Sequence, residues 1–151
     1  MDLEKGHFYF LTPEFYLTFQ DMGLMNDENR PAMMSFYDKG TGFYWLIPIS
    51  SRVEKYERTY AQKMKKYGLC DTIVFGDVLG VRKAFLIQNM FPVTPEFILN
   101  EYLSNNESVR IATPVEEEII IKAKKVLALS RYKKAGLLFT NISKMTEILN
   151  K

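Results

Sequence analysis

The pattern of apolar and polar residues along the chain predicts a mixture of strands and helices. Short apolar or aromatic runs bounded by Gly, Pro or Asn are typical of strands. The predicted strands cover residues 6–12, 31–38, 42–49, 72–75 and 83–88. The second and third of these flank a connection that contains Gly40, which supplies the positive φ that a tight hairpin needs.

Helix starts are marked by capping residues. Three Thr-Pro pairs each place a cap before a proline at the first helical position. Ser50 or Ser51 can cap another helix, with Glu54 completing a capping box. The predicted helices cover residues 13–21, 53–67, 95–103, 114–135 and 142–150. The longest has acids in its first turn, basic residues in its last turns, and an apolar stripe, which suits a helix packed on a core.

These elements do not alternate as regular βα units, which indicates an α+β fold with a mainly antiparallel sheet. A length of 151 residues predicts one domain over residues 1–151, and 47% hydrophobic residues are ample for its core. Neither a signal peptide nor a membrane-spanning run is expected, and the single Cys70 fits a reducing cytoplasm. One histidine and one cysteine exclude a His-rich or Cys-rich metal site and a two-histidine acid–base pair. No cofactor is expected.

Charge is distributed unevenly along the chain. Residues 1–29 contain six acids and one Lys, residues 52–66 contain six basic residues and two Glu, and residues 122–151 contain eight basic residues and one Glu. Such asymmetry indicates a polyanionic partner, although solvated helix faces explain it equally well.

The best candidate for chemistry is the strand end Ser50-Ser51-Arg52, with Lys55 one helical turn further on. Hydroxyls, free helix amides and cations together can hold phosphate oxygens. A plain helix cap with surface cations is the alternative. The helix over 53–67 then interleaves Lys55, Arg58 and Lys63 with tyrosines, including Tyr56, which suits RNA phosphates and unpaired bases. Its tyrosines could equally face the core.

The order of these motifs resembles the ToxN/AbiQ toxins of type III toxin–antitoxin systems, with the CptN toxins as the most similar subgroup. The resemblance rests on Arg30-Pro31, a hairpin, Pro48-Ile49-Ser50-Ser51, and a Lys-rich segment. An apolar strand that leads through Asn89-Met90 to Pro92-Val93 adds to it, as does an aromatic strand followed by a helix with Tyr16. Together these motifs cover most of residues 7–95.

The resemblance implies a strongly twisted sheet with a Kid/MazF-like core and a metal-independent endoribonuclease. It implies inhibition by a small, repetitive pseudoknot antitoxin RNA, which the toxin itself cuts, and a closed complex of toxin and RNA. Ser51 matches the family's active-site hydroxyl, Ser50 its neighbour, and Arg30 the arginine of the Arg-Pro pair. Where many members have Pro-Lys, this chain has Arg52-Val53.

The sequence thus predicts a cytoplasmic bacterial ribonuclease toxin, of the kind used in phage defence, with no metal and no membrane partner. Its substrates are cellular RNA and its antitoxin RNA, and attack by the RNA's own 2′-OH leaves a 2′,3′-cyclic phosphate. The alternatives are a non-catalytic RNA-binding module and a type II MazF/Kid-like ribonuclease inhibited by a protein. The predicted catalytic residues are Ser51, Ser50, Arg52 and Lys55. The predicted RNA-binding residues are Arg30, Tyr9, Tyr44, Tyr56, Arg58, Lys63, Lys133 and Lys134.

Overall fold

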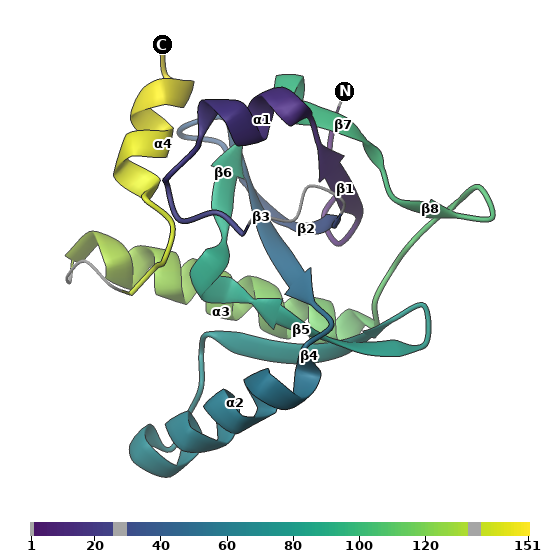
Figure 1. Ribbon diagram of the computed structural model, residues 1–151, viewed down its shortest axis with the longest axis vertical. Helices are drawn as coiled ribbons and strands as arrows, with labels where there is room; N and C mark the ends of the chain where they lie inside the picture. Colours follow the sequence, from purple (N-terminus) through teal and green to yellow (C-terminus); the bar gives the residue numbers. More distant parts are fainter. Residues whose placement is uncertain (1, 26–29, 133–136) are drawn as a thin grey trace.

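A seven-stranded antiparallel sheet organises the structure, a computed structural model that describes residues 2–25, 30–132 and 137–151 (Figure 1). Six strands follow the order β4-β5-β3-β2-β1-β7, and β6 pairs separately with β3. The strands are β1 (Phe8–Leu11), β2 (Ala32–Asp38), β3 (Phe43–Ser50), β4 (Ile73–Val78), β5 (Val81–Leu86), β6 (Phe91–Val93) and β7 (Ile98–Glu101). The α+β class and the mainly antiparallel sheet are therefore confirmed.

Strand β3 lies at the centre of this sheet and changes partners along its length. Its first part pairs with β2 on one side and with β6 on the other, where Trp45 lies opposite Pro92. Its last two residues pair instead with β5, where Ile49 lies opposite Phe85 and Ser50 opposite Ala84. In Figure 1 β3 crosses the molecule and ends beside the β4–β5 hairpin, at the start of α2.

Four α-helices surround the sheet: α1 (Pro13–Thr18), α2 (Val53–Tyr67), α3 (Thr113–Tyr132) and α4 (Ile142–Leu149). Helix α3 buries Ile119, Ala123 and Val126 against the main core, as its predicted stripe requires. Helix α2 buries no residue completely, and only one side of it packs on the sheet, through Tyr56 and Tyr60. None of the described helices is both long and apolar enough to cross a membrane.

The predicted helix over 95–103 is wrong. Only the 3₁₀ turn η2 (Pro95–Phe97) forms there, and the chain then enters β7. Thr94 caps nothing because its hydroxyl donates to the Glu96 carboxylate, 2.6 Å away. Pairing with the open edge of β1 supplies backbone hydrogen bonds that outweigh the local helix signal. A small hairpin, β8 (Leu103–Ser104) and β9 (Glu107–Ser108), follows and was also not predicted.

Tyr9 belongs to the core and does not present its ring to a ligand. Its side chain is 2% exposed, and its hydroxyl oxygen accepts a hydrogen bond from the Glu4 amide at 2.7 Å. Burial, with the nearby acids Glu101 and Glu4, raises the pKa of Tyr9 above its usual value. Tyr9, predicted as an RNA-binding residue, is thus placed in the core because both faces of β1 are covered: Phe8 packs in the main core and Tyr9 in a second apolar cluster.

Candidate active site

The end of β3 places two adjacent hydroxyls on opposite sides of the backbone. Ser50, the last strand residue, is buried, whereas Ser51 is exposed. This alternation follows from the two-residue period of a strand. The Ser50 hydroxyl oxygen accepts a hydrogen bond from the Arg52 amide at 3.1 Å. Ser50 therefore holds the turn between β3 and α2, and only Ser51 can touch a ligand in this conformation.

Ser51 contacts a lysine, Lys83, that was not among the predicted site residues. Lys83 Nζ donates a hydrogen bond to Ser51 Oγ at 2.7 Å. The β3–β5 register explains the contact, because the pairs Ile49–Phe85 and Ser50–Ala84 bring Ser51 opposite Lys83 when continued by one residue. In the sequence, Lys83 stands two residues before Phe85 and therefore on the same side of its strand. That position points to Ser51 only once β3 is known to be the neighbouring strand.

Ser51 and Lys83 line a cleft of about 290 Å³. Its walls come from the segment before β2, the end of β3, the β4–β5 hairpin and Tyr102. The lining residues are Arg30, Pro31, Ile49, Ser51, Val78, Leu79, Val81, Lys83 and Tyr102. The sequence predicted that Arg30 would lie near the Ser pair, and Arg30 and Ser51 do line the same cleft, whereas Ser50 does not. Three residues with phosphate-binding chemistry thus meet where β3 ends.

Helix α2 begins without a side-chain cap. Its N-cap residue is the exposed Arg52, which makes no capping hydrogen bond. The predicted cap by Ser50 or Ser51, and the capping box with Glu54, are therefore wrong. The reason is competition: the Ser50 hydroxyl is engaged by the Arg52 amide and the Ser51 hydroxyl by Lys83. The Val53 amide donates instead to the Ser51 carbonyl at 2.9 Å, so a backbone oxygen serves the first turn of α2.

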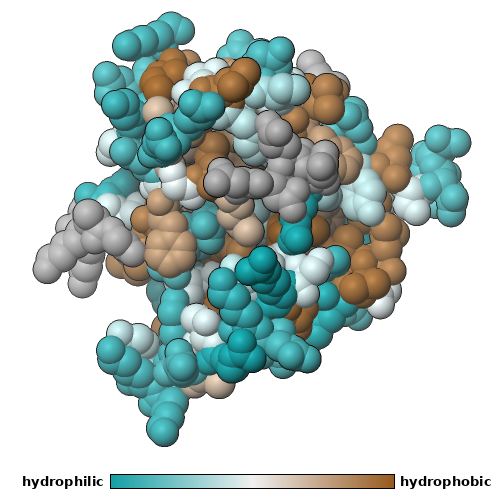
Figure 2. All heavy atoms as spheres, viewed as in Figure 1, coloured by the Kyte–Doolittle hydropathy of each residue, from teal (hydrophilic) through white to brown (hydrophobic). Residues whose placement is uncertain are grey.

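Lys55 does not join Ser51 in this cleft. Its ammonium lies 5.2 Å from the centre of the Tyr56 ring, and both residues line a second pocket, beside α2, together with Lys63. Arg58 is exposed on α2 and lines neither pocket. Figure 2 shows hydrophilic side chains gathered over α2 on this face of the molecule. The lysine in contact with Ser51 is therefore Lys83, and the predicted catalytic residue Lys55 lies in the neighbouring pocket.

Tyr44, another predicted site residue, is not part of this arrangement. It lies near the opposite end of β3, six residues before Ser50 and so roughly 20 Å away. Its ring packs 4.6 Å from that of Tyr37, and burial raises its pKa above the usual value. Lys133 and Lys134 lie outside the described residues.

The single histidine is part of a separate charged cluster. His7 is buried, with Nδ1 2.9 Å from Glu101 Oε2, and with Nε2 3.1 Å from Glu4 Oε2 and 3.2 Å from Arg110 Nη1. Within residues 2–25, 30–132 and 137–151, no group of three or more His, Cys, Asp or Glu side chains is arranged to hold a metal ion.

Comparison with solved structures relates this fold to a known ribonuclease. The chain superimposes on AbiQ, a lactococcal anti-phage endoribonuclease belonging to the type-III toxin–antitoxin system, with a TM-score of 0.72 over 97% of each chain. The two sequences are 14% identical. Comparison by sequence finds no matching protein-family model and no matching curated protein. The fold implied by the resemblance to ToxN/AbiQ toxins is confirmed, whereas the CptN subgroup stays a prediction.

The uncapped start of α2 predicts that Arg52→Ser stabilises the protein. A serine at this N-cap position can accept a hydrogen bond from the first turn, which is worth about 1 kcal/mol. We expect the free energy of unfolding in urea to rise by about that amount. Arg58→Ser, in the middle of the same helix, is the control and should not stabilise. A lower unfolding free energy for Arg52→Ser would mean that Arg52 makes a stabilising contact of its own.

Proposed function

We propose that residues 1–151 form one endoribonuclease toxin domain that cuts RNA without a metal ion. The observation that carries this proposal is the Ser51–Lys83 hydrogen bond inside a cleft that Arg30 also lines. The likeness to AbiQ supports it at the level of the fold. A cleft with cations and an exposed hydroxyl suits a phosphodiester, whose charge increases at the phosphorus during cleavage.

The hydrogen bond from Lys83 orients the Ser51 hydroxyl. Because Ser51 Oγ accepts from Lys83, its own O–H is left to donate. A non-bridging oxygen of the scissile phosphate, seated in the cleft, would receive that hydrogen bond. Arg30 on the cleft wall, and Arg52 next to Ser51 in the chain, would add charge to the same phosphate. Fixing the phosphate in this way aligns it with the neighbouring 2′-OH. The loss of freedom that attack of the 2′-oxygen on phosphorus requires then occurs partly on binding, which lowers the barrier of the reaction.

The reaction that these groups favour is internal transesterification. The 2′-oxygen forms a bond to phosphorus and loses its proton, while the bond from phosphorus to the 5′-oxygen breaks and that oxygen gains a proton. The products are a 2′,3′-cyclic phosphate and a free 5′-OH. The Lys83 ammonium can stabilise the pentacoordinate phosphorus and is placed to protonate the leaving oxygen. Lys55, which the sequence predicted as a catalytic residue, lines the neighbouring pocket.

Ser51→Ala and Lys83→Met should each abolish growth arrest by the expressed protein. Loss of a positioned acid–base group lowers the rate by roughly 10²–10⁴-fold, so RNA cleavage by Lys83→Met should fall by that factor. Lys65→Met removes an exposed charge from the far end of α2 and should cut RNA normally. Growth arrest, RNA cleavage and thermal unfolding are to be compared at equal protein levels. If Ser51→Ala cells still stop growing, the active site lies elsewhere.

The chemistry predicts specific RNA ends and no response to chelation. Products should have a 2′,3′-cyclic phosphate and a 5′-OH, and EDTA should leave the cleavage rate unchanged. End-group analysis of one labelled RNA, with and without EDTA, checks both expectations. A 5′-phosphate with a free 3′-OH, or activity that EDTA removes, would contradict this mechanism. Binding without any shortening would favour the non-catalytic RNA-binding module.

We further propose a small non-coding antitoxin RNA with pseudoknot repeats as the inhibitor. The toxin would cut this RNA into repeat units and assemble with them in the cytoplasm into a closed complex held mainly by RNA. Digesting the RNA of the purified complex should then release single protein chains, which mass measurement would detect. A complex whose protein mass is unchanged by this digestion would contradict RNA as the link. A protein inhibitor recovered from that complex would instead indicate the type II alternative.

A further inference from the structure

The second pocket lies between α2 and the 3₁₀ turn η1 (Ile87–Asn89) and is larger than the Ser51 cleft, at about 510 Å³. Its lining residues are Lys55, Tyr56, Thr59, Lys63, Thr72, Ile73, Leu86, Gln88, Asn89 and Phe139. They include two lysines, two side-chain amides and two aromatic rings, and no carboxylate. A pocket with this composition attracts an anion and offers hydrogen-bonding groups beside it.

Lys63 gives this pocket a positive charge that no acid among the described residues neutralises. Its ammonium donates to Thr72 Oγ1 at 2.6 Å and to Gln88 Oε1 at 3.1 Å, and both partners are neutral. Two lysines on the adjacent helix α3 differ, because Lys122 lies 2.8 Å from Glu118 and Lys125 2.7 Å from Asp71. Lys63 is half-buried, so neutral partners hold its charge toward the pocket.

The two amides in the pocket have different roles. Gln88 is fixed, because its Nε2 donates to the Leu137 carbonyl at 2.8 Å while its Oε1 accepts from Lys63. The half-buried Asn89 makes no side-chain hydrogen bond with the rest of the described chain. An Asn amide has a donor and an acceptor side by side, which matches the edge of a nucleobase. Phe139 is 58% exposed on the same pocket and offers a ring for stacking.

This pocket is related to the Ser51 cleft through shared lining residues. Asn89 also lines a small pocket of about 30 Å³, which shares Arg30 with the cleft. A chain of lining residues therefore leads from Lys83 and Ser51, past Arg30, to Asn89 and Lys63. An RNA strand held at Ser51 can thus place its next nucleotide beside α2.

We infer that the pocket beside α2 binds the nucleotide next to the scissile phosphate and reads its base. Asn89 pairs with the base edge, Phe139 stacks on its face, and Lys63 with Lys55 holds the adjoining phosphate. The inference rests on the proposed function, since it gives the cutting site a base preference on one side. RNA bases are commonly recognised when unpaired, by stacking and by edge hydrogen bonds of this kind.

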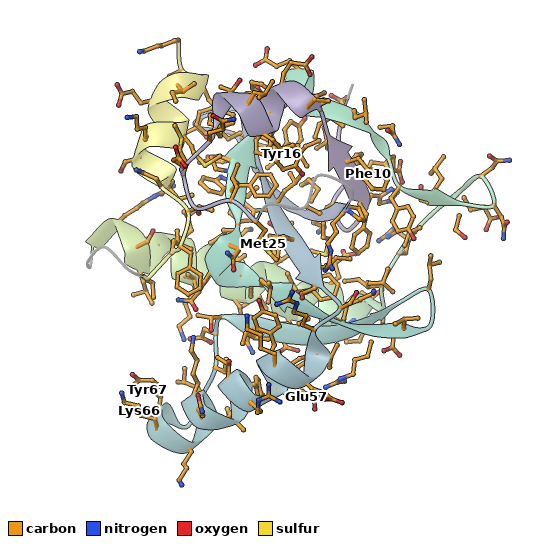
Figure 3. The ribbon with its side chains drawn as sticks, in the orientation of Figure 1. Phe10, Tyr16, Met25, Glu57, Lys66 and Tyr67 are labelled. Carbon is orange, nitrogen blue, oxygen red and sulfur yellow. The ribbon has the colours of Figure 1, made fainter. Side chains whose placement is uncertain are left out.

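The test compares three variants on a pool of single-stranded RNA with random sequence, in which cut sites are sequenced. Asn89→Ala should lower the preference for the favoured base at one position beside the cut by roughly tenfold, while Lys63→Met should slow cutting of all sequences. Lys66→Met, at the far end of α2 (Figure 3), removes the same charge away from the pocket and should change neither property. Asn89→Asp keeps the shape but loses the donor, and it replaces Asn89→Ala if that variant unfolds.

Binding of fully 2′-O-methylated RNA, which cannot be cut, separates this inference from the proposed function. If the wild-type chain cuts RNA and Asn89→Ala leaves its base preference unchanged, the pocket inference is overturned and the cutting site stands. If the wild-type chain cuts no RNA but binds the methylated RNA with a preference that Asn89→Ala removes, the pocket stands and the catalytic proposal fails. Equal base preference of Asn89→Ala and Lys66→Met in both assays would overturn the assigned role of Asn89.

Discussion

The candidate site depends on the change of partner at the end of β3. Over Tyr44–Leu46 this strand pairs with β6, and at Ile49 and Ser50 it pairs with β5. Backbone hydrogen bonds fix the second register, and a shift of one residue would turn every β5 side chain to the opposite face. Lys83 would then point away from Ser51. The 2.7 Å contact between them is therefore a consequence of sheet pairing rather than of local sequence.

The residues at the end of β3 and the start of α2 do not maximise the stability of the helix. Arg52 stands where a capping residue would stabilise α2, and the hydroxyl of Ser51 is held by a lysine instead of serving the helix. Residues that do not stabilise the local structure are expected at functional sites, where a residue is selected for binding a ligand and not for stability.

Elements that are determined by neighbouring residues could be predicted from the sequence, whereas contacts between residues far apart in the chain could not. The β2–β3 hairpin and the starts of α1 and α3 are encoded by neighbouring residues, and the structure has them where the sequence placed them. Strand β7 was mistaken for a helix because Thr94-Pro95-Glu96 is a local cap signal, whereas the open edge of β1 lies far away in the chain. Lys83 was missed for the same reason. Its partner Ser51 precedes it by 32 residues, and only the three-dimensional pairing brings the two together.

Charge totals locate the site less well than the pairing of individual charges. The segment 122–151 has the larger excess of basic residues, yet Lys122 and Lys125 within it are matched by Glu118 and Asp71. Lys83 and Lys63, by contrast, have only neutral oxygens as hydrogen-bond partners among the described residues. Exposed ion pairs attract a polyanion weakly because each cation is already compensated. The cations held by hydroxyls and amides therefore mark where an RNA phosphate gains most on binding: Lys83 lines the Ser51 cleft and Lys63 the pocket beside α2.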